Sequence, residues 1–212
     1  HDARRQRQMC IRDSLETVHS YGGVVIADVN TVDFAKKCAD YGADGLALVS
    51  HGAGGHTGTL SPFVFTSHVR DFFEGIVVLA GSISNGSHIR AAQCLGADLC
   101  YMGTRFIATD ESIAVKEYKE MVINAKSTDL RLTNLFTGAN AYYLKDSIIN
   151  NNLDPDNLET NDKGFNISGS QDKISAWKDI WSAGQGVGFS NTIQALENVV
   201  TELENEWGEN KT

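Results

Sequence analysis

The hydrophobic positions of this chain form short, continuous apolar runs separated by amphipathic stretches. Four of these runs lack polar alternation, at residues 24–27, 46–49, 76–80 and 99–102. Continuous apolar runs of this length are typical of strands buried on both faces of a parallel sheet. Strands that alternate with helical patterns at this spacing predict βαβ units.

Helices are predicted between and after these strands from apolar residues that recur on one helix face. The first is a helix tail that contains Leu15 and Val18 and ends at the glycines at 22 and 23. The others pass through Phe34, Cys38 and Tyr41, through residues 67–73, through Ile89, Ala92 and Leu95, and through Ile113, Tyr118, Met121 and Val122. A closing helix is predicted from Ile193, Leu196, Val200, Leu203 and Trp207. Residues 150–157, rich in Asn and Asp, are predicted to form an exposed connection.

The turn Gly-Ala-Asp occurs twice before a predicted strand, at residues 42–44 and 96–98. This weak internal repeat favours a barrel of similar units. Four βα units are half of a (β/α)8 TIM barrel, and four strands cannot close, so the first and last strands would carry unpaired edges. We therefore expect an α/β fold in which residues 15–212 form the last four βα units and the C-terminal helices of one barrel domain. A complete small α/β protein is the alternative.

The first fourteen residues differ in character from the rest. They are polar without helical periodicity, and residues 9–14 (Met-Cys-Ile-Arg-Asp-Ser) resemble a translated sequencing-adapter read-through. We interpret residues 1–14 as non-native and exclude them from the fold prediction. A basic arm or linker is the alternative interpretation.

Composition narrows the classes of function. The chain has 212 residues, 42% of them hydrophobic, which is enough for one sizeable core. Its net charge of −9 argues against nucleic acid or an anionic membrane as a partner, and no apolar run approaches the roughly 20 residues of a membrane span. The four cysteines form no Cys-x-x-Cys pair, so we expect a reduced, cytoplasmic setting without a structural disulfide or zinc site.

Glycine-rich loops follow the last three predicted strands. The first loop places His51 and His56 among the glycines at 52, 54, 55 and 58. Glycine admits positive φ and lets a ligand approach the backbone, so this loop suits an active-site rim; a mobile surface turn with two solvated histidines is the alternative. The loops at 81–86 and 103–104 lie where barrels commonly bind phosphate. Together they favour a phosphate-bearing cofactor or substrate over ordinary βα turns.

Six segments carry a resemblance to a known family. They are residues 53–58 (Ala-Gly-Gly-His-Thr-Gly), 80–83 (Ala-Gly-Ser-Ile), 102–106 (Met-Gly-Thr-Arg-Phe), 135–138 (Leu-Phe-Thr-Gly), 153–156 (Leu-Asp-Pro-Asp) and 181–186 (Trp-Ser-Ala-Gly-Gln-Gly). In this order they resemble the motifs of nitronate monooxygenases, formerly 2-nitropropane dioxygenases. The resemblance implies a TIM barrel that holds non-covalent FMN and uses His56 as the catalytic base. The FMN-binding residues it implies are Gly54, Gly55, Gly81, Ser82, Tyr101, Met102, Gly103, Thr104 and Gln185.

The chain departs from the family pattern at two positions. Val49 stands where many members have glutamine, so one polar contact to the flavin is absent or supplied elsewhere. Ser82 stands where the second glycine of Ala-Gly-Gly is usual, and its Cβ must fit beside the phosphate.

The reaction implied by the resemblance is the oxidation of alkyl nitronates by O2 to carbonyl compounds and nitrite. A neutral nitroalkane must first lose an α-proton, which a histidine can accept near neutral pH. We assign this role to His56 and regard His51 as a strand-end residue; in the alternative, His56 only bonds a loop carbonyl. Two other functions stay open, an FMN-dependent, NADH-consuming enoyl-acyl-carrier-protein reductase and an inactive fragment without flavin. A homodimer is one way to pair the two open strand edges.

Overall fold

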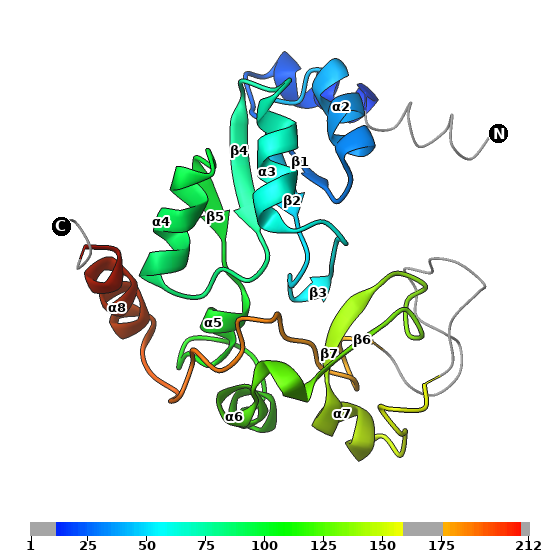
Figure 1. Ribbon diagram of the computed structural model, residues 1–212, viewed down its shortest axis with the longest axis vertical. Helices are drawn as coiled ribbons and strands as arrows, with labels where there is room; N and C mark the ends of the chain where they lie inside the picture. The colour runs from blue at the N-terminus through cyan, green and yellow to red at the C-terminus, as the bar shows by residue number, and fades with distance from the viewer. Residues whose placement is uncertain (1–11, 159–175, 209–212) are drawn as a thin grey trace.

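The computed structural model of the chain describes residues 12–158 and 176–208. Within these ranges the central element is a four-stranded sheet in the order β1-β2-β4-β5 (Figure 1). Its strands are β1 (Ile26–Val29), β2 (Gly45–Val49), β4 (Ile76–Ala80) and β5 (Leu99–Tyr101). Every neighbouring pair is parallel, so all four carboxyl ends lie at the same edge of the sheet.

Three helices connect these strands and cover one face of the sheet. They are α2 (Val32–Asp40), α3 (Pro62–Arg70) and α4 (Gly86–Cys94). Alternate strand residues such as Leu46, Leu48 and Leu79 pack with Phe65 and Val69 of α3 in the largest hydrophobic cluster of the described residues. The alternation follows from the strand geometry, because successive side chains point to opposite faces.

The opposite face of the sheet carries a row of residues that pair across all four strands. Asp28 pairs with Ala47, Ala47 with Val78, and Val78 with Leu99, so their side chains share one face. Ala47 and Val78 in the middle are buried, whereas the row ends in an exposed Asp28 and a Leu99 that is 55% exposed. The margins of this face are therefore open to solvent.

A second, antiparallel sheet lies beside the carboxyl ends of the first, in the order β3-β7-β6. Its strands are β3 (Gly55–His56), β6 (Leu130–Thr133) and β7 (Ala141–Leu144). The same half of the molecule holds α5 (Thr104–Ile107), α6 (Lys116–Asn124), the 3-10 turn η1 (Ser127–Asp129) and α7 (Lys145–Asn150) (Figure 1). This sheet is not predicted from the sequence, because its strands are only two to four residues long and lie among loop-forming residues.

The last helix, α8 (Leu196–Gly208), returns to pack against α4 (Figure 1). Its backbone approaches Gly86 so closely that an added Cβ there would collide with main-chain atoms of Glu206 and Trp207. The carboxylate of Glu206 accepts a hydrogen bond from Gly86 N at 2.8 Å, and the Arg90 guanidinium donates to the carbonyl oxygens of Glu206 and Trp207. These bonds fix the C-terminal helix beside the βα units.

The predicted strands and helices occur in the predicted order, with shifts in position, but Ile113, predicted on the helix of Tyr118, precedes α6 and is fully exposed. The first strand begins two residues later than predicted and continues through Asp28, a polar residue whose side chain lies on the open face. The helix predicted at 67–73 is α3, which starts at Pro62, a residue suited to the first helical turn. On α8 the buried residues are Val199 and Leu203, so the predicted apolar face is confirmed at Leu203 and wrong at Leu196, Val200 and Trp207, which are exposed.

Two predictions about the extent of the fold stay predictions. Among the described residues β1 and β5 each have one neighbouring strand, as expected for an open sheet, but this does not establish half of a barrel. Residues 1–11 of the segment interpreted as non-native lie outside the described ranges, and residues 12–20 are helical. In the part of the chain that the structure describes, no helix combines the length and apolar character needed to cross a membrane.

Candidate active site

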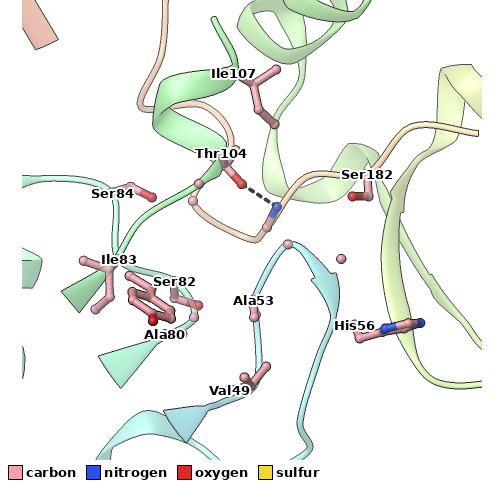
Figure 2. Close-up of a pocket in the computed structure, with 18 of the residues that line it drawn as sticks. Val49, Ala53, His56, Ala80, Ser82, Ile83, Ser84, Thr104, Ile107 and Ser182 are labelled. Carbon is pink, nitrogen blue, oxygen red and sulfur yellow. Dashed lines mark hydrogen bonds between the residues drawn. The ribbon is translucent and has the colours of Figure 1, made fainter. Parts of the chain in front are cut away.

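A cavity of about 540 Å³ opens where the strands of the parallel sheet end. Each of the four strands contributes one residue to its lining, namely Asp28, Val49, Ala80 and Tyr101. The rest of the lining comes from β3, from α5, from the loops after β2, β4 and β5, and from the segment that precedes α8 (Figure 2). Ligands of parallel α/β proteins bind outside the carboxyl ends of the strands, so this cavity is the candidate active site.

Glycines allow two separate segments to touch at one wall of the cavity. A Cβ added to Gly54 would lie 2.8 Å from Gly184 N, and one added to Gly184 would lie 2.7 Å from Gly52 O. A side chain at either position would push the loop after β2 away from the segment before α8. Gly54, predicted to bind the cofactor, therefore also allows the loop after β2 to contact the segment before α8.

Gly103 and Thr104 border the cavity in another way. A Cβ added to Gly103 would meet no protein atom within 4 Å, so its backbone faces open space that a ligand can occupy. Thr104 Oγ1 accepts a hydrogen bond from Gly184 N at 2.8 Å, the dashed line in Figure 2. Because that bond uses a lone pair, the hydroxyl proton of Thr104 stays available to a ligand.

Ser82 adopts a backbone conformation that serine rarely takes. Its φ is +59° and that of the preceding Gly81 is +114°, so two successive residues after β4 lie at positive φ. Glycine adopts positive φ without strain, which explains why members of the family that the motifs resemble usually have glycine at the position of Ser82. The Ser82 hydroxyl lies 3.4 Å from both His51 O and Gln185 Oε1, at the outer limit of a hydrogen bond.

His56 is held by the second sheet rather than by its own loop. It lies in β3, where it pairs with Ala141 of β7, and its Nε2 lies 3.0 Å from Thr137 Oγ1. The Thr137 hydroxyl donates to Ala139 O at 3.2 Å, so we assign Nε2 as the protonated nitrogen that donates to Thr137. Desolvation lowers the pKa of His56 below its ordinary value of 6.5. The imidazole is therefore largely neutral at pH 7 and able to accept a proton.

A hydrogen-bonded chain behind the cavity links three elements that are distant in sequence. Gln185 Nε2 donates to Tyr142 Oη at 2.7 Å, and Tyr142 Oη lies 3.0 Å from His51 Nε2. Since the amide nitrogen can only donate, the Tyr142 hydroxyl proton is the one directed to His51. Gln185 N also donates to Gly52 O at 2.9 Å. His51, regarded from sequence as a strand-end residue, is thus part of the support of the glycine loop.

The structure brings most of the predicted site residues to one cavity. His56, Gly54, Gly55, Gly81, Ser82, Tyr101, Gly103 and Thr104 all belong to its lining. Met102 and Gln185 do not, although Gln185 contacts Ser82 and Tyr142. FMN binding by these residues stays a prediction.

Four residues at or beside the cavity were not predicted from the sequence. Asp28 and Trp177 belong to the lining, and Thr137 and Tyr142 bond the two histidines. The segment 135–138 that contains Thr137 was recognised as a motif, but its contact with His56 spans 81 residues of sequence. Among the described residues, no group of three or more His, Cys, Asp or Glu side chains could hold a metal ion.

The fold and cavity define an α/β protein of the class that binds ligands at the carboxyl ends of parallel strands. The chain belongs to the nitronate monooxygenase family, because the family's model matches residues 8–177. The matched range begins inside the segment 1–14 that we interpret as non-native. The resemblance seen in the six motifs is thereby confirmed at the level of the family.

Curated relatives and solved structures agree with this membership. A probable nitronate monooxygenase of Staphylococcus haemolyticus is 34% identical over an alignment of 131 residues that covers 55% of this chain and 36% of that protein. The (3aS,4S,5R,7aS)-5-hydroxy-7a-methyl-1-oxo-octahydro-1H-indene-4-carboxyl-CoA dehydrogenase of Mycobacterium tuberculosis is 34% identical over 107 residues, 49% of this chain and 30% of that protein. The chain thus spans about a third of the length of these curated relatives.

The structure also resembles a solved protein of TIM-barrel type. The FabK (M276A) mutant from Thermotoga maritima matches with a TM-score of 0.72 and 24% identity, over 93% of this chain and 64% of FabK. At this identity the likeness shows the fold alone. It supports an α/β fold with a parallel sheet, similar to that of TIM-barrel proteins.

Proposed function

We propose that this protein is an FMN-dependent nitronate monooxygenase that oxidises alkyl nitronates with O2 to carbonyl compounds and nitrite. The observation that carries the proposal is one cavity bordered by the loops of His56, Ser82 and Thr104, in a chain of the nitronate monooxygenase family. The catalytic base and the cofactor loops of the resemblance lie around the same space. A surface turn with solvated histidines would not require this convergence.

The cavity suits a flavin with a phosphate group. The open space at Gly103 leaves room for a ligand against the backbone, and Ser82 and Thr104 offer hydroxyl groups beside it. The described lining contains no lysine or arginine, so a phosphate would be held by backbone N–H and hydroxyl donors. On this proposal Gly81, Ser82, Gly103 and Thr104 hold the phosphate.

The protein's part in the reaction is to position the substrate and to move one proton. When bound, FMN accepts electrons from the substrate and passes them to O2. A nitronate already carries the electron pair that the reaction needs, so the cavity has only to orient it. A neutral nitroalkane first transfers its α-proton to the imidazole of His56, and the C–H electron pair becomes part of the nitronate. The lowered pKa of His56 keeps the imidazole neutral for this step.

The proposal is tested by purifying the protein and recording its absorbance spectrum, its O2 consumption with propyl-1-nitronate and its response to NADH under anaerobic conditions. We expect a flavin spectrum, nitronate-dependent O2 consumption and no bleaching of the flavin by NADH. Rapid bleaching by NADH, without nitronate turnover, would support the enoyl-acyl-carrier-protein reductase instead. A colourless protein that takes up no added FMN would contradict both.

The cofactor position is tested by Gly103→Trp. No protein atom lies within 4 Å of an added Cβ, so the indole can be accommodated by the fold and would fill the cavity. We expect flavin content to fall below about a tenth of the wild-type value, with equal melting temperatures of the two apoproteins. Gly208→Trp is the matched control, because Gly208 at the end of α8 is equally open and lies outside the cavity lining.

A further inference from the structure

Trp177 is exposed inside the cavity in a conformation that tryptophan rarely adopts. It belongs to the lining, its surface is 44% exposed, and its φ is +70°. A bulky residue at positive φ is strained, and such strain persists only where the surroundings fix the residue. A strained aromatic residue with an open face in a cavity is a candidate ligand contact.

The surroundings of Trp177 hold it firmly on one side. Its backbone N–H donates to Ile180 O at 3.0 Å, and its indole stacks on Tyr143, with ring centroids 5.4 Å apart and an interplanar angle of 30°. Tyr143 is fully buried in a hydrophobic cluster with Phe136 and Ile148. The indole therefore rests on the rigid core of the second sheet.

The other side of Trp177 faces the proposed base and the glycine loop. The rings of Trp177 and His56 meet edge to face, with centroids 5.3 Å apart. A Cβ added to Gly55 would lie 3.6 Å from Cη2 and 3.7 Å from Cζ3 of the indole. Trp177 and His56 thus form adjacent parts of one wall of the cavity, next to a glycine that leaves both rings accessible.

We propose that Trp177 determines substrate specificity by packing its indole against the aliphatic chain of a nitronate or nitroalkane whose reacting carbon lies at His56. The inference rests on the proposed function and deepens it. An aromatic surface of this kind favours apolar substituents, and each buried methylene contributes about 0.8 kcal/mol, which is about a fourfold gain in kcat/KM. Chain length is therefore the property that Trp177 selects.

The kinetic test compares ethyl, propyl-1-, butyl-1- and hexyl-1-nitronate in the flavin-loaded protein and in Trp177→Gly. Glycine takes a φ of +70° without strain, so this variant removes the indole and relieves the backbone. In the wild type we expect kcat/KM to rise about threefold to fourfold per methylene, mainly through KM. In Trp177→Gly we expect kcat/KM to rise by less than about twofold per methylene.

Binding without turnover gives a second readout. Propanoate, butanoate and hexanoate carry the charge of a nitronate and cannot react, so their dissociation constants are measured by titration calorimetry. We expect the same loss of chain-length dependence in Trp177→Gly and its retention in Trp177→Phe, which keeps an aromatic wall. Phe63→Ala, an exposed aromatic residue on α3 and outside the cavity lining, is the control and should leave both series unchanged.

The outcomes separate the two proposals. A wild type that oxidises no nitronate contradicts the proposed function. A wild type that oxidises nitronates but shows the same chain-length dependence with and without Trp177 overturns the specificity role. Equal loss on every substrate and on every carboxylate would assign Trp177 to the architecture of the His56 loop.

Discussion

His56 combines three properties that suit a base at the residue scale. Its backbone is fixed by pairing with β7, its Nε2 is engaged by Thr137, and desolvation lowers its pKa. Because a hydrogen-bonded imidazole keeps one tautomer, the proton to be accepted must go to the other ring nitrogen. The His56 side chain is positioned by Thr137, which lies 81 residues away in the sequence and outside the glycine motif that contains His56.

We predict that His56→Asn loses turnover of neutral nitroalkanes by about 10²–10⁴-fold, the usual contribution of a general base. Turnover of preformed nitronates should fall by less than about tenfold, since no proton has to be removed. Steady-state O2 consumption with nitroethane and ethyl nitronate checks both values. Equal losses on the two substrates would show that His56 serves binding or architecture.

The pH dependence gives the same role an independent measurement. The pKa of His56 in the folded protein lies below 6.5, so the acid limb of kcat/KM for nitroethane should have its midpoint below pH 6.5 and vanish in His56→Asn. Folding stability should also decrease as pH falls. His56 has a lower pKa in the folded protein than in the unfolded chain, so the stability contributed by the neutral imidazole is present above pH 6.5 and is lost as pH falls through the folded pKa.

Tyr142→Phe is predicted to weaken FMN binding although Tyr142 is outside the cavity lining. The variant keeps the ring and removes the hydroxyl that bonds both Gln185 and His51, which leaves the loops of Gly52 and Ser82 less firmly joined. Loss of hydrogen bonds worth about 0.5–1.5 kcal/mol should raise the dissociation constant of FMN by about twofold to tenfold. Fluorescence titration of the apoprotein with FMN measures the effect, with Tyr41→Phe on the remote face of the sheet as control. An unchanged constant would exclude the hydroxyl from the support of the site.

At the scale of elements, α8 and α4 each provide a side chain that hydrogen-bonds the backbone at one end of the other helix. The carboxylate of Glu206 accepts a bond from Gly86 at the N-terminus of α4, where a negative charge is favourable, and Arg90 bonds the last carbonyl groups of α8. The interaction fixes α8 and thereby the segment before it, which carries Gln185. The position of the site depends on the seating of the C-terminal helix.

Glu206→Ala should accordingly lower the free energy of unfolding by about 1 kcal/mol, the value of a helix N-terminal carboxylate with its hydrogen bond. Glu204→Ala is the matched control on the same helix, because Glu204 is exposed, and it should change stability by less than about 0.5 kcal/mol. Urea denaturation followed by circular dichroism compares them. Two variants of equal stability would mean that the Glu206 bond contributes nothing net.

The elements differ in how far the sequence predicts them, for physical reasons. Buried parallel strands such as Ile76–Ala80 form continuous apolar runs and are readily predicted. The pairing of β3 with β7 depends on contacts across more than eighty residues, and two-residue strands leave no periodic signal. The same holds within the site, where the glycine motifs predicted much of the lining but not the contacts of Thr137, Tyr142 and Trp177, which come from the β6–β7 loop, from β7 and from the segment before α8.

At the scale of the whole molecule, the parallel sheet is open at both sides. In the described residues β1 and β5 each lack a second neighbour, and on β5 the side chains of Leu99 and Tyr101 are 55% and 50% exposed. Strand edges with exposed apolar side chains are templates for pairing with another chain. The central sheet therefore carries a surface suited to association.

We predict that the chain of 212 residues associates in solution through these edges, with a homodimer as the simplest form. Leu99→Lys places a charge on the edge strand, where burial of a leucine contributes about 1.5–3 kcal/mol, so the dissociation constant of the dimer should rise at least about tenfold. Ile113→Lys is the matched control, because Ile113 is fully exposed and lies outside the sheet. It should leave association unchanged.

Sedimentation equilibrium over a range of protein concentrations measures both constants. A wild-type chain that stays monomeric at tens of micromolar would contradict the prediction, and equal effects of the two lysines would show that association proceeds through general hydrophobic contact rather than through the edge of β5.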